Sequence, residues 1–233
     1  LSTLMLWGSS TLAAQPGGEQ NLSLRLELMS WMTRALASDS GKTESFLPAY
    51  GFLTARGWNL GGSGVFGEVH GYLAGELLGA NREIVRSGDL VLGFTGWRDP
   101  KGRFETRGGR LIVYSGGAWP AYVDGSMVRG RPLSWLVLEA HGGREVRDAF
   151  GSPSGPVFGG RVALDRYEIG TFGVAFQERM HDSETAHRLL ASDFALRVWQ
   201  PLRLRGTAAY DLKAEDLEEA QLHASVQPHP WVF

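Results

Sequence analysis

The sequence predicts an all-β fold, an up-and-down antiparallel barrel of about twelve strands. Apolar and polar residues alternate with a period of two along most of the chain, and the segments between the alternating runs are in turn short and long. Glycine is abundant, with 32 residues, and aromatic residues reach 11%. Small residues beside large rings suit strands better than long helices.

The alternation is clearest at the two ends of the chain. Leucines occupy every second position from Leu22 to Leu28, with polar residues between them, and Ala220 and Leu222 oppose Gln221 and His223 near the end. Successive side chains of a strand point to opposite faces, so each run gives one apolar and one polar face. We expect strands near residues 21–32, 47–58, 65–77, 89–98, 103–114, 121–129, 133–141, 157–164, 168–179, 190–199, 202–211 and from 219 onward.

One of these runs changes its pattern at a pair of glycines. Arg103, Glu105 and Arg107 share one face, whereas Leu111 and Val113 continue at the same spacing beyond Gly108–Gly109. An extra residue in one strand shifts the phase of everything after it. We therefore expect a β-bulge at the two glycines.

The connections alternate in length. The segments 35–45, 78–88, 142–156 and 180–189 read as long, and 115–120 and 212–217 as medium. The turns at 59–64, 99–102, 130–132, 165–167 and 200–201 between them read as short. A meander inserted from one side of a membrane has short turns on one rim and longer loops on the other, so the rhythm favours an up-and-down antiparallel transmembrane β-barrel.

Composition narrows the function classes. A net charge of -2 provides no basic field for nucleic acid, and the absence of cysteine removes disulfides, thiolate metal sites and cysteine nucleophiles. Beyond residue 15 no stretch reaches the ~18 apolar residues of a spanning helix. We expect no enzyme activity, no cofactor, no metal and no nucleic-acid partner.

The two ends of the chain suggest processing and truncation. Residues 1–15 resemble the apolar part of an export signal with a small-residue cleavage site, although an ordinary apolar first strand would look similar. Residues 16–233 then form the barrel domain. Pro228 and Pro230 would interrupt a last strand ending at Phe233, so we expect that the barrel continues beyond this chain.

Together these features resemble Gram-negative outer-membrane β-barrel proteins of the porin-like type. The segment from Arg107-Gly108-Gly109-Arg110 through Gly116-Gly117-Ala118 to Val123-Asp124-Gly125 is similar to the paired strands with a Gly-Arg step of those proteins. The resemblance implies export through the periplasm to the outer membrane, contact with membrane lipid, and a pore or a structural surface protein. Small solutes would pass if it is a pore, while the solute and the oligomeric state stay open.

The same picture assigns two sets of residues. The residues expected to line the lumen are Arg25, Glu27, Arg103, Glu105, Arg107, Arg110, Arg203, Arg205, Gln221 and His223. The residues expected in aromatic girdles at the two membrane interfaces are Trp58, Trp97, Tyr114, Trp119, Tyr122, Trp135, Tyr167, Trp199 and Tyr210.

Other interpretations remain open. A soluble secreted β-rich binding module, which presents its long loops to a sugar or protein, would show the same alternation with leucines inside. Gly62 to Val69 matches a glycine-rich nucleotide motif, but alternation in place of a helix follows it. His181 and His187 lie in an acidic segment with Asp182 and Glu184 that could loosely hold a cation. A barrel hydrolase using His70, Asp124, Ser126 and His141 ranks last.

Overall fold

The computed structural model describes residues 4–14, 21–36, 43–76, 87–146, 155–199 and 202–226. These residues form strands and turns, without a helix. The strands are β1 (Leu4–Ala14), β2 (Asn21–Leu36), β3 (Thr43–Phe46), β4 (Pro48–Leu60), β5 (Val65–Glu76), β6 (Ser87–Arg98), β7 (Phe104–Val113), β8 (Ala121–Leu133), β9 (Leu136–Glu145), β10 (Pro156–Arg166), β11 (Gly170–His181), β12 (Glu184–Trp199), β13 (Leu202–Asp211) and β14 (Asp216–Val226).

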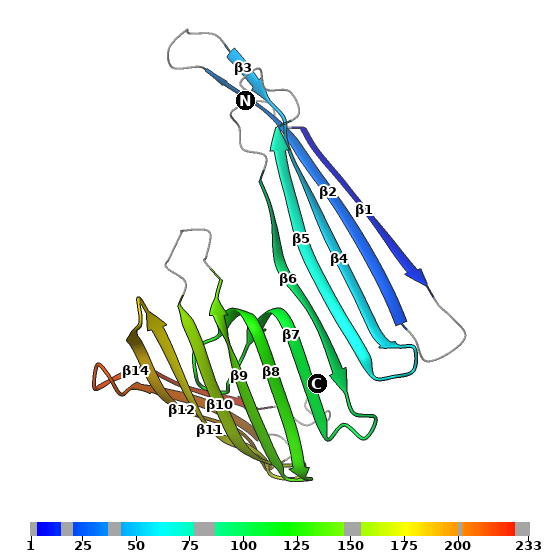
Figure 1. The fold of residues 1–233 in the computed structure, drawn as a ribbon. Coiled ribbons are helices and arrows are strands. Elements are labelled where there is room, and N and C mark those ends of the chain that lie inside the picture. Colours follow the sequence, from blue (N-terminus) through cyan, green and yellow to red (C-terminus); the bar gives the residue numbers. More distant parts are fainter. Residues whose placement is uncertain are drawn as a thin grey trace. The chain divides into compact units, whose positions relative to one another are not determined.

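The strands are hydrogen-bonded in chain order (Figure 1). The order runs from β1 to β14, with the short β3 paired to β2 beside this path. Within the described residues no pairing joins β14 back to β1. The chain divides into two compact units, Leu1–Thr95 and Gly96–Phe233, and the boundary falls inside β6. The observed fold is therefore an all-β, up-and-down antiparallel sheet.

The twelve predicted strands are all present, with ends that differ by a few residues. Two further strands, β1 and β3, were not among them. Residues 4–14, expected in the export segment, form β1 and pair with β2 from Leu4 opposite Met32 to Ala14 opposite Leu22. Removal of this segment stays a prediction, and the residues on which truncation was argued, 227–233, lie outside the described part of the chain.

The expected bulge at Gly108–Gly109 is wrong. The β7–β8 register is continuous from Phe104 opposite Gly130 to Val113 opposite Ala121. Glu105 and Leu111 therefore lie on the same face of β7, and both are buried. The prediction failed because it assumed that charged and apolar residues cannot share a face.

The expected rhythm of connections holds only in part. The segment 180–189 was expected to be a long loop, but strands continue to His181 and from Glu184. Asp182 and Ser183 alone form the turn, with positive φ angles of 47° and 68°. Two central residues with positive φ match the tight hairpin turn that follows strand twist. The prediction failed because it treated the polar residues of this segment as the sign of a long loop.

Of two further turns, one lies at another position than predicted and the other is confirmed. The turn expected at Gly130-Arg131-Pro132 falls at Ser134–Trp135, and Pro132 lies where the β8–β9 register is irregular. Gly61, Gly62 and Gly64 form a turn with positive φ, which glycine tolerates best. Strand β5 follows that turn directly, so the glycine-rich motif belongs to a hairpin. No helix in the described residues has the length and apolar character needed to cross a membrane.

Candidate functional site

In the second unit each strand separates a polar face from an apolar face. We define the polar face as the positions in register with Glu105, and the apolar face as those in register with Phe104. Every buried apolar residue of β7–β13 lies on the polar face. These residues are Leu111, Val113, Ala121, Val123, Val137, Val157, Ala163, Ala175, Leu189, Ala191 and Ala209.

The apolar face is the more exposed one. Val162 is 54% exposed in the centre of β10, and Leu222 is 71% exposed in β14. Other exposed members are Phe104, Val128, Leu138, Leu164, Phe172, Val174, Leu190, Tyr210 and Val226. Charged residues occur on this face near the rim of the β7–β8 connection, as Arg110 paired with Asp124 and Arg188 paired with Glu178. Between these pairs and the opposite rim lies an uncharged band.

On the polar face a row of alternating charges crosses four strands. Glu105 lies opposite Arg129, Arg129 opposite Glu139, and Glu139 opposite Arg161. The Nε atom of Arg129 lies 3.2 Å from Glu139, and Glu105 also binds Arg98 and Arg107, each at 2.6 Å. Opposite charges placed on neighbouring strands stabilise the register.

The row continues to β12 through a bidentate ion pair. Arg161 donates hydrogen bonds to both oxygens of Asp193, at 2.9 and 2.6 Å. Gly173 of β11 lies beneath this pair, where a Cβ atom would come within 2.7 Å of both partners. The glycine therefore lets the side chains of Arg161 and Asp193 meet across an intervening strand.

The connection between β7 and β8, residues 114–120, folds onto the polar face. A Cβ atom at Gly117 would lie 2.4 Å from the carbonyl oxygen of Ser192 in β12 and 3.2 Å from that of Ala208 in β13. Ala118 forms a buried cluster with Ala175, Ala191 and Ala209. A connection beside β7 thus contacts strands four to six places away in the sheet, which shows how strongly this unit curves.

Polar and aromatic contacts hold both ends of the connection. Ser115 and His141 form a hydrogen bond of 3.1 Å between Oγ and Nδ1. Arg179 donates to the carbonyl oxygen of Pro120 at 2.8 Å and lies 5.6 Å from the ring centre of Trp119. The edge of Trp119 in turn contacts His187, with ring centres 5.2 Å apart.

Beneath the connection two buried polar side chains lack partners. The side chain of Gln177 is fully buried, and neither its oxygen nor its nitrogen has a hydrogen-bond partner in the described structure. The Nε2 atom of His141 is also without one. A Cβ atom at Gly159 would lie 3.0 Å from that Nε2 atom, so His141 covers this glycine. Ordered water commonly satisfies such groups.

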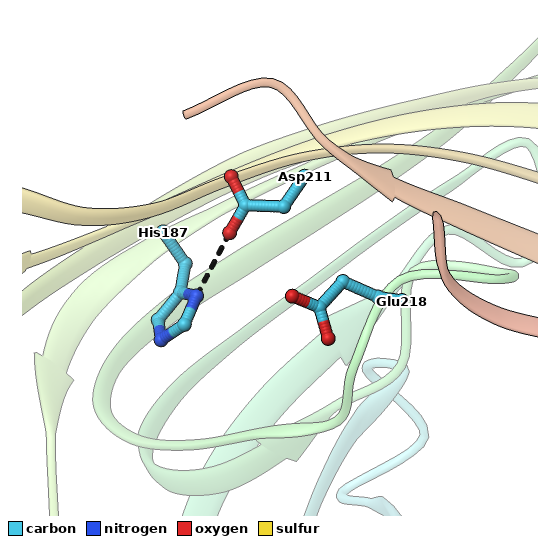
Figure 2. A group of neighbouring side chains, drawn as sticks. All are labelled: His187, Asp211 and Glu218. Carbon is cyan, nitrogen blue, oxygen red and sulfur yellow. Dashed lines mark hydrogen bonds and ion pairs between the residues drawn. The ribbon is translucent and has the colours of Figure 1, made fainter. Parts of the chain in front are cut away.

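Among the described residues, one group could hold a metal ion: His187, Asp211 and Glu218, whose ligand atoms lie within 4.8 Å of one another (Figure 2). Asp211 is 1% exposed and binds Nδ1 of His187 at 2.9 Å. Its other oxygen accepts bonds from the backbone of Arg188, Lys213 and Ala214. Burial raises the pKa of Asp211, but these hydrogen bonds outweigh it and lower the pKa to about 2. The carboxylate thereby closes the β13–β14 turn at the rim.

The expected lumen residues divide into three groups. Glu105 and Arg107 in β7, Arg203 and Arg205 in β13, and Gln221 and His223 in β14 lie on the polar face. Arg103 belongs to the β6–β7 connection, and Arg110 lies on the apolar face with Asp124. Arg25 and Glu27 pair with each other in β2 of the first unit. Sequence reasoning missed Arg129, Glu139, Arg161 and Asp193, although alternation within their own strands marked them.

The expected girdle residues lie mostly near strand ends. Trp97, Trp135 and Tyr167 lie near the short turns, whereas Tyr114, Tyr122 and Tyr210 lie near the other rim. Trp58 stacks on the buried Phe66 with ring centres 5.6 Å apart. Trp119 lies in the connection against the polar face. The side chain of Trp199 lies outside the described part of the chain.

The structure does not assemble the other sites considered from sequence. His141 lies on the polar face, whereas Asp124 and Ser126 lie on the apolar face of β8. His181 contacts Asp182 at 3.3 Å, while His187 contacts Asp211 instead. Comparison with protein-family models and with curated proteins finds no match.

Proposed function

We propose that the chain forms a membrane-embedded β-sheet of the outer-membrane barrel type, closed by strands of this or a longer chain. In this proposal the polar face lines the interior and the apolar face contacts lipid. The observation that carries it is the contrast between the faces: the buried face holds paired charges beside its small and aliphatic residues, whereas the middle of the exposed face is uncharged and aliphatic. A water-soluble barrel requires a polar outer face.

The uncharged band on the apolar face supports this role. Lipid hydrocarbon tolerates charged side chains poorly, and the charged residues of this face lie near its two rims, with Arg166 at the rim opposite the β7–β8 connection. A depression of about 350 Å³ on the other side of the band is lined mainly by apolar groups, including Trp135, Leu164 and Phe172. Such a surface suits acyl chains.

The polar face supports passage of small solutes through a narrow interior. Paired charges of both signs keep the interior hydrated, and along the central row they give no strong preference for anions or for cations. The connection at residues 114–120 occupies part of this face and would narrow the route. We therefore favour a pore for small solutes over a wide channel.

Two substitutions in β14 separate this proposal from a soluble binding module. Gln221 and Leu222 are neighbours, both are exposed, and they lie on opposite faces. Arginine in a lipid-facing position near the midplane costs about 2–4 kcal/mol, whereas a polar interior tolerates it. Leu222→Arg should therefore reduce insertion into phospholipid vesicles by at least tenfold, while Gln221→Arg should insert as the parent does.

The measurement is flotation of the refolded full chain with vesicles, followed by alkaline extraction. A parent chain that stays soluble without detergent and does not float would overturn the proposal and favour the soluble module. Equal insertion of the two arginine variants would overturn the assignment of the faces.

A further inference from the structure

Most arginines on the polar face have a carboxylate partner, but three near the rim opposite the β7–β8 connection do not. Arg129, Arg131, Arg161 and Arg179 each pair with Asp or Glu. By contrast, Arg197, Arg203 and Arg205 have no ion pair or hydrogen bond from their side chains within the described residues, and all three are exposed.

The register brings these three arginines together. Arg197 lies directly opposite Arg203 on β12 and β13, and Arg205 is one step further on the same face of β13. Side chains directly opposite in an antiparallel pair have Cβ atoms about 4.5–5.5 Å apart, and like charges there oppose each other. The sheet accordingly holds three guanidinium groups close together without an internal counter-charge.

The neighbouring side chains on β14 add donors and no carboxylate. His223 lies opposite Arg205, and Ser225 lies opposite Arg203 on β14. Asp193, two positions before Ala195 on β12, is already bound to Arg161. Arg197, Arg203 and Arg205 also line a depression of about 160 Å³ together with Tyr167. It offers room for a small ion with water.

We propose that this arginine cluster is a binding site for a small oxyanion, of the phosphate or phosphate-monoester class. Planar guanidinium groups bind phosphate oxygens through paired hydrogen bonds, and several of them around one anion relieve their own repulsion. A role of this site in the passage of a solute through the interior rests on the proposed pore. Binding itself does not, because it requires only the folded sheet.

The test is binding of inorganic phosphate to the refolded full chain in neutral detergent, measured by isothermal titration calorimetry at low salt. The parent should bind phosphate, and Arg203→Gln and Arg205→Gln should each weaken binding by about tenfold or more. Arg144→Gln is the matched control, because Arg144 is also exposed without an ion pair but lies on the apolar face at the other rim. It should bind within about twofold of the parent.

Two outcomes overturn the site. They are no phosphate binding by the folded parent, and binding that survives both Gln substitutions. Failure of the chain to insert into vesicles, with phosphate binding intact, would count against the pore and leave the site standing.

A lipid phosphate has the same chemistry as a soluble one, so a second arm distinguishes them. In vesicles of phosphatidylcholine, addition of phosphatidylglycerol should leave phosphate binding within about twofold, because the cluster lies on the polar face. Loss of phosphate binding in the anionic vesicles would assign the cluster to a lipid headgroup and overturn the soluble oxyanion.

Discussion

The ion pair between Arg161 and Asp193 offers the sharpest test of how the polar face is stabilised. Its two hydrogen bonds measure 2.9 and 2.6 Å, and its side chains are only 10% and 16% exposed. The next carboxylate, Glu139, lies 3.8 Å from Arg161 and already binds Arg129. Asp193→Ala would therefore leave a nearly buried guanidinium with one shared and distant counter-charge.

The expected cost follows from this geometry. Breaking a buried pair by removing one partner costs about 3–5 kcal/mol, and the remaining Glu139 places the value near the lower end. A loss of about 3 kcal/mol lowers the folding equilibrium constant by roughly a hundredfold. Replacing both partners with apolar residues, as in Arg161→Met with Asp193→Leu, should cost less than about 1.5 kcal/mol, because no charge is left unpaired.

The assay is urea unfolding of the refolded chain in detergent micelles, followed by tryptophan fluorescence. Asp165→Ala is the matched control, since the Arg131–Asp165 pair is more open, with side chains 38% and 28% exposed. It should cost about 1 kcal/mol or less. The reasoning is refuted if Asp193→Ala costs no more than Asp165→Ala, or if the double variant is as unstable as Asp193→Ala.

Two further predictions concern the connection and the rim. Gly117→Ala places a Cβ atom 2.4 Å from a backbone oxygen and should move the connection away from the polar face. The expected loss of folding free energy is about 1–3 kcal/mol, and acrylamide quenching of Trp119 should increase. Gly130→Ala is the control, because a Cβ atom there meets nothing within 4 Å. Unchanged quenching would contradict the close packing of the connection against the polar face. Because the pKa of Asp211 is lowered to about 2, its stabilising contribution is complete above about pH 4 and is lost as the pH falls toward 2. Asp211→Asn should flatten this part of the stability profile in unfolding titrations between pH 5 and pH 2, and an unchanged slope would contradict the assignment.

The strands were predictable because period-two alternation survives almost everywhere in the chain. The positions of turns were less so, since Pro132 and the polar run around Asp182 mark irregular pairing and a tight hairpin as well as they mark loops. Turn chemistry depends on φ angles, which composition alone does not specify.

The site residues were predictable only where the alternation within a single strand places them on one face. Glu105 and Arg107 could be placed on the polar face from their own strand, but Arg161 and Asp193 meet across Gly173, from strands that are not neighbours. The contact of Gly117 and Ala118 with the polar face likewise depends on the curvature of six strands. Such long-range contacts have no characteristic residue spacing by which the sequence could reveal them.

The central claim is that the apolar face meets lipid, and β13 tests it most directly. The chain has no native cysteine, so single cysteines can carry a nitroxide label at each position from Leu202 to Tyr210 in vesicles. Collision with oxygen, which concentrates in hydrocarbon, should be high at Leu202, Leu204, Gly206, Ala208 and Tyr210 and low at the positions between them. High oxygen collision at Arg203, Arg205 and Thr207, or the absence of any alternation, would contradict the account.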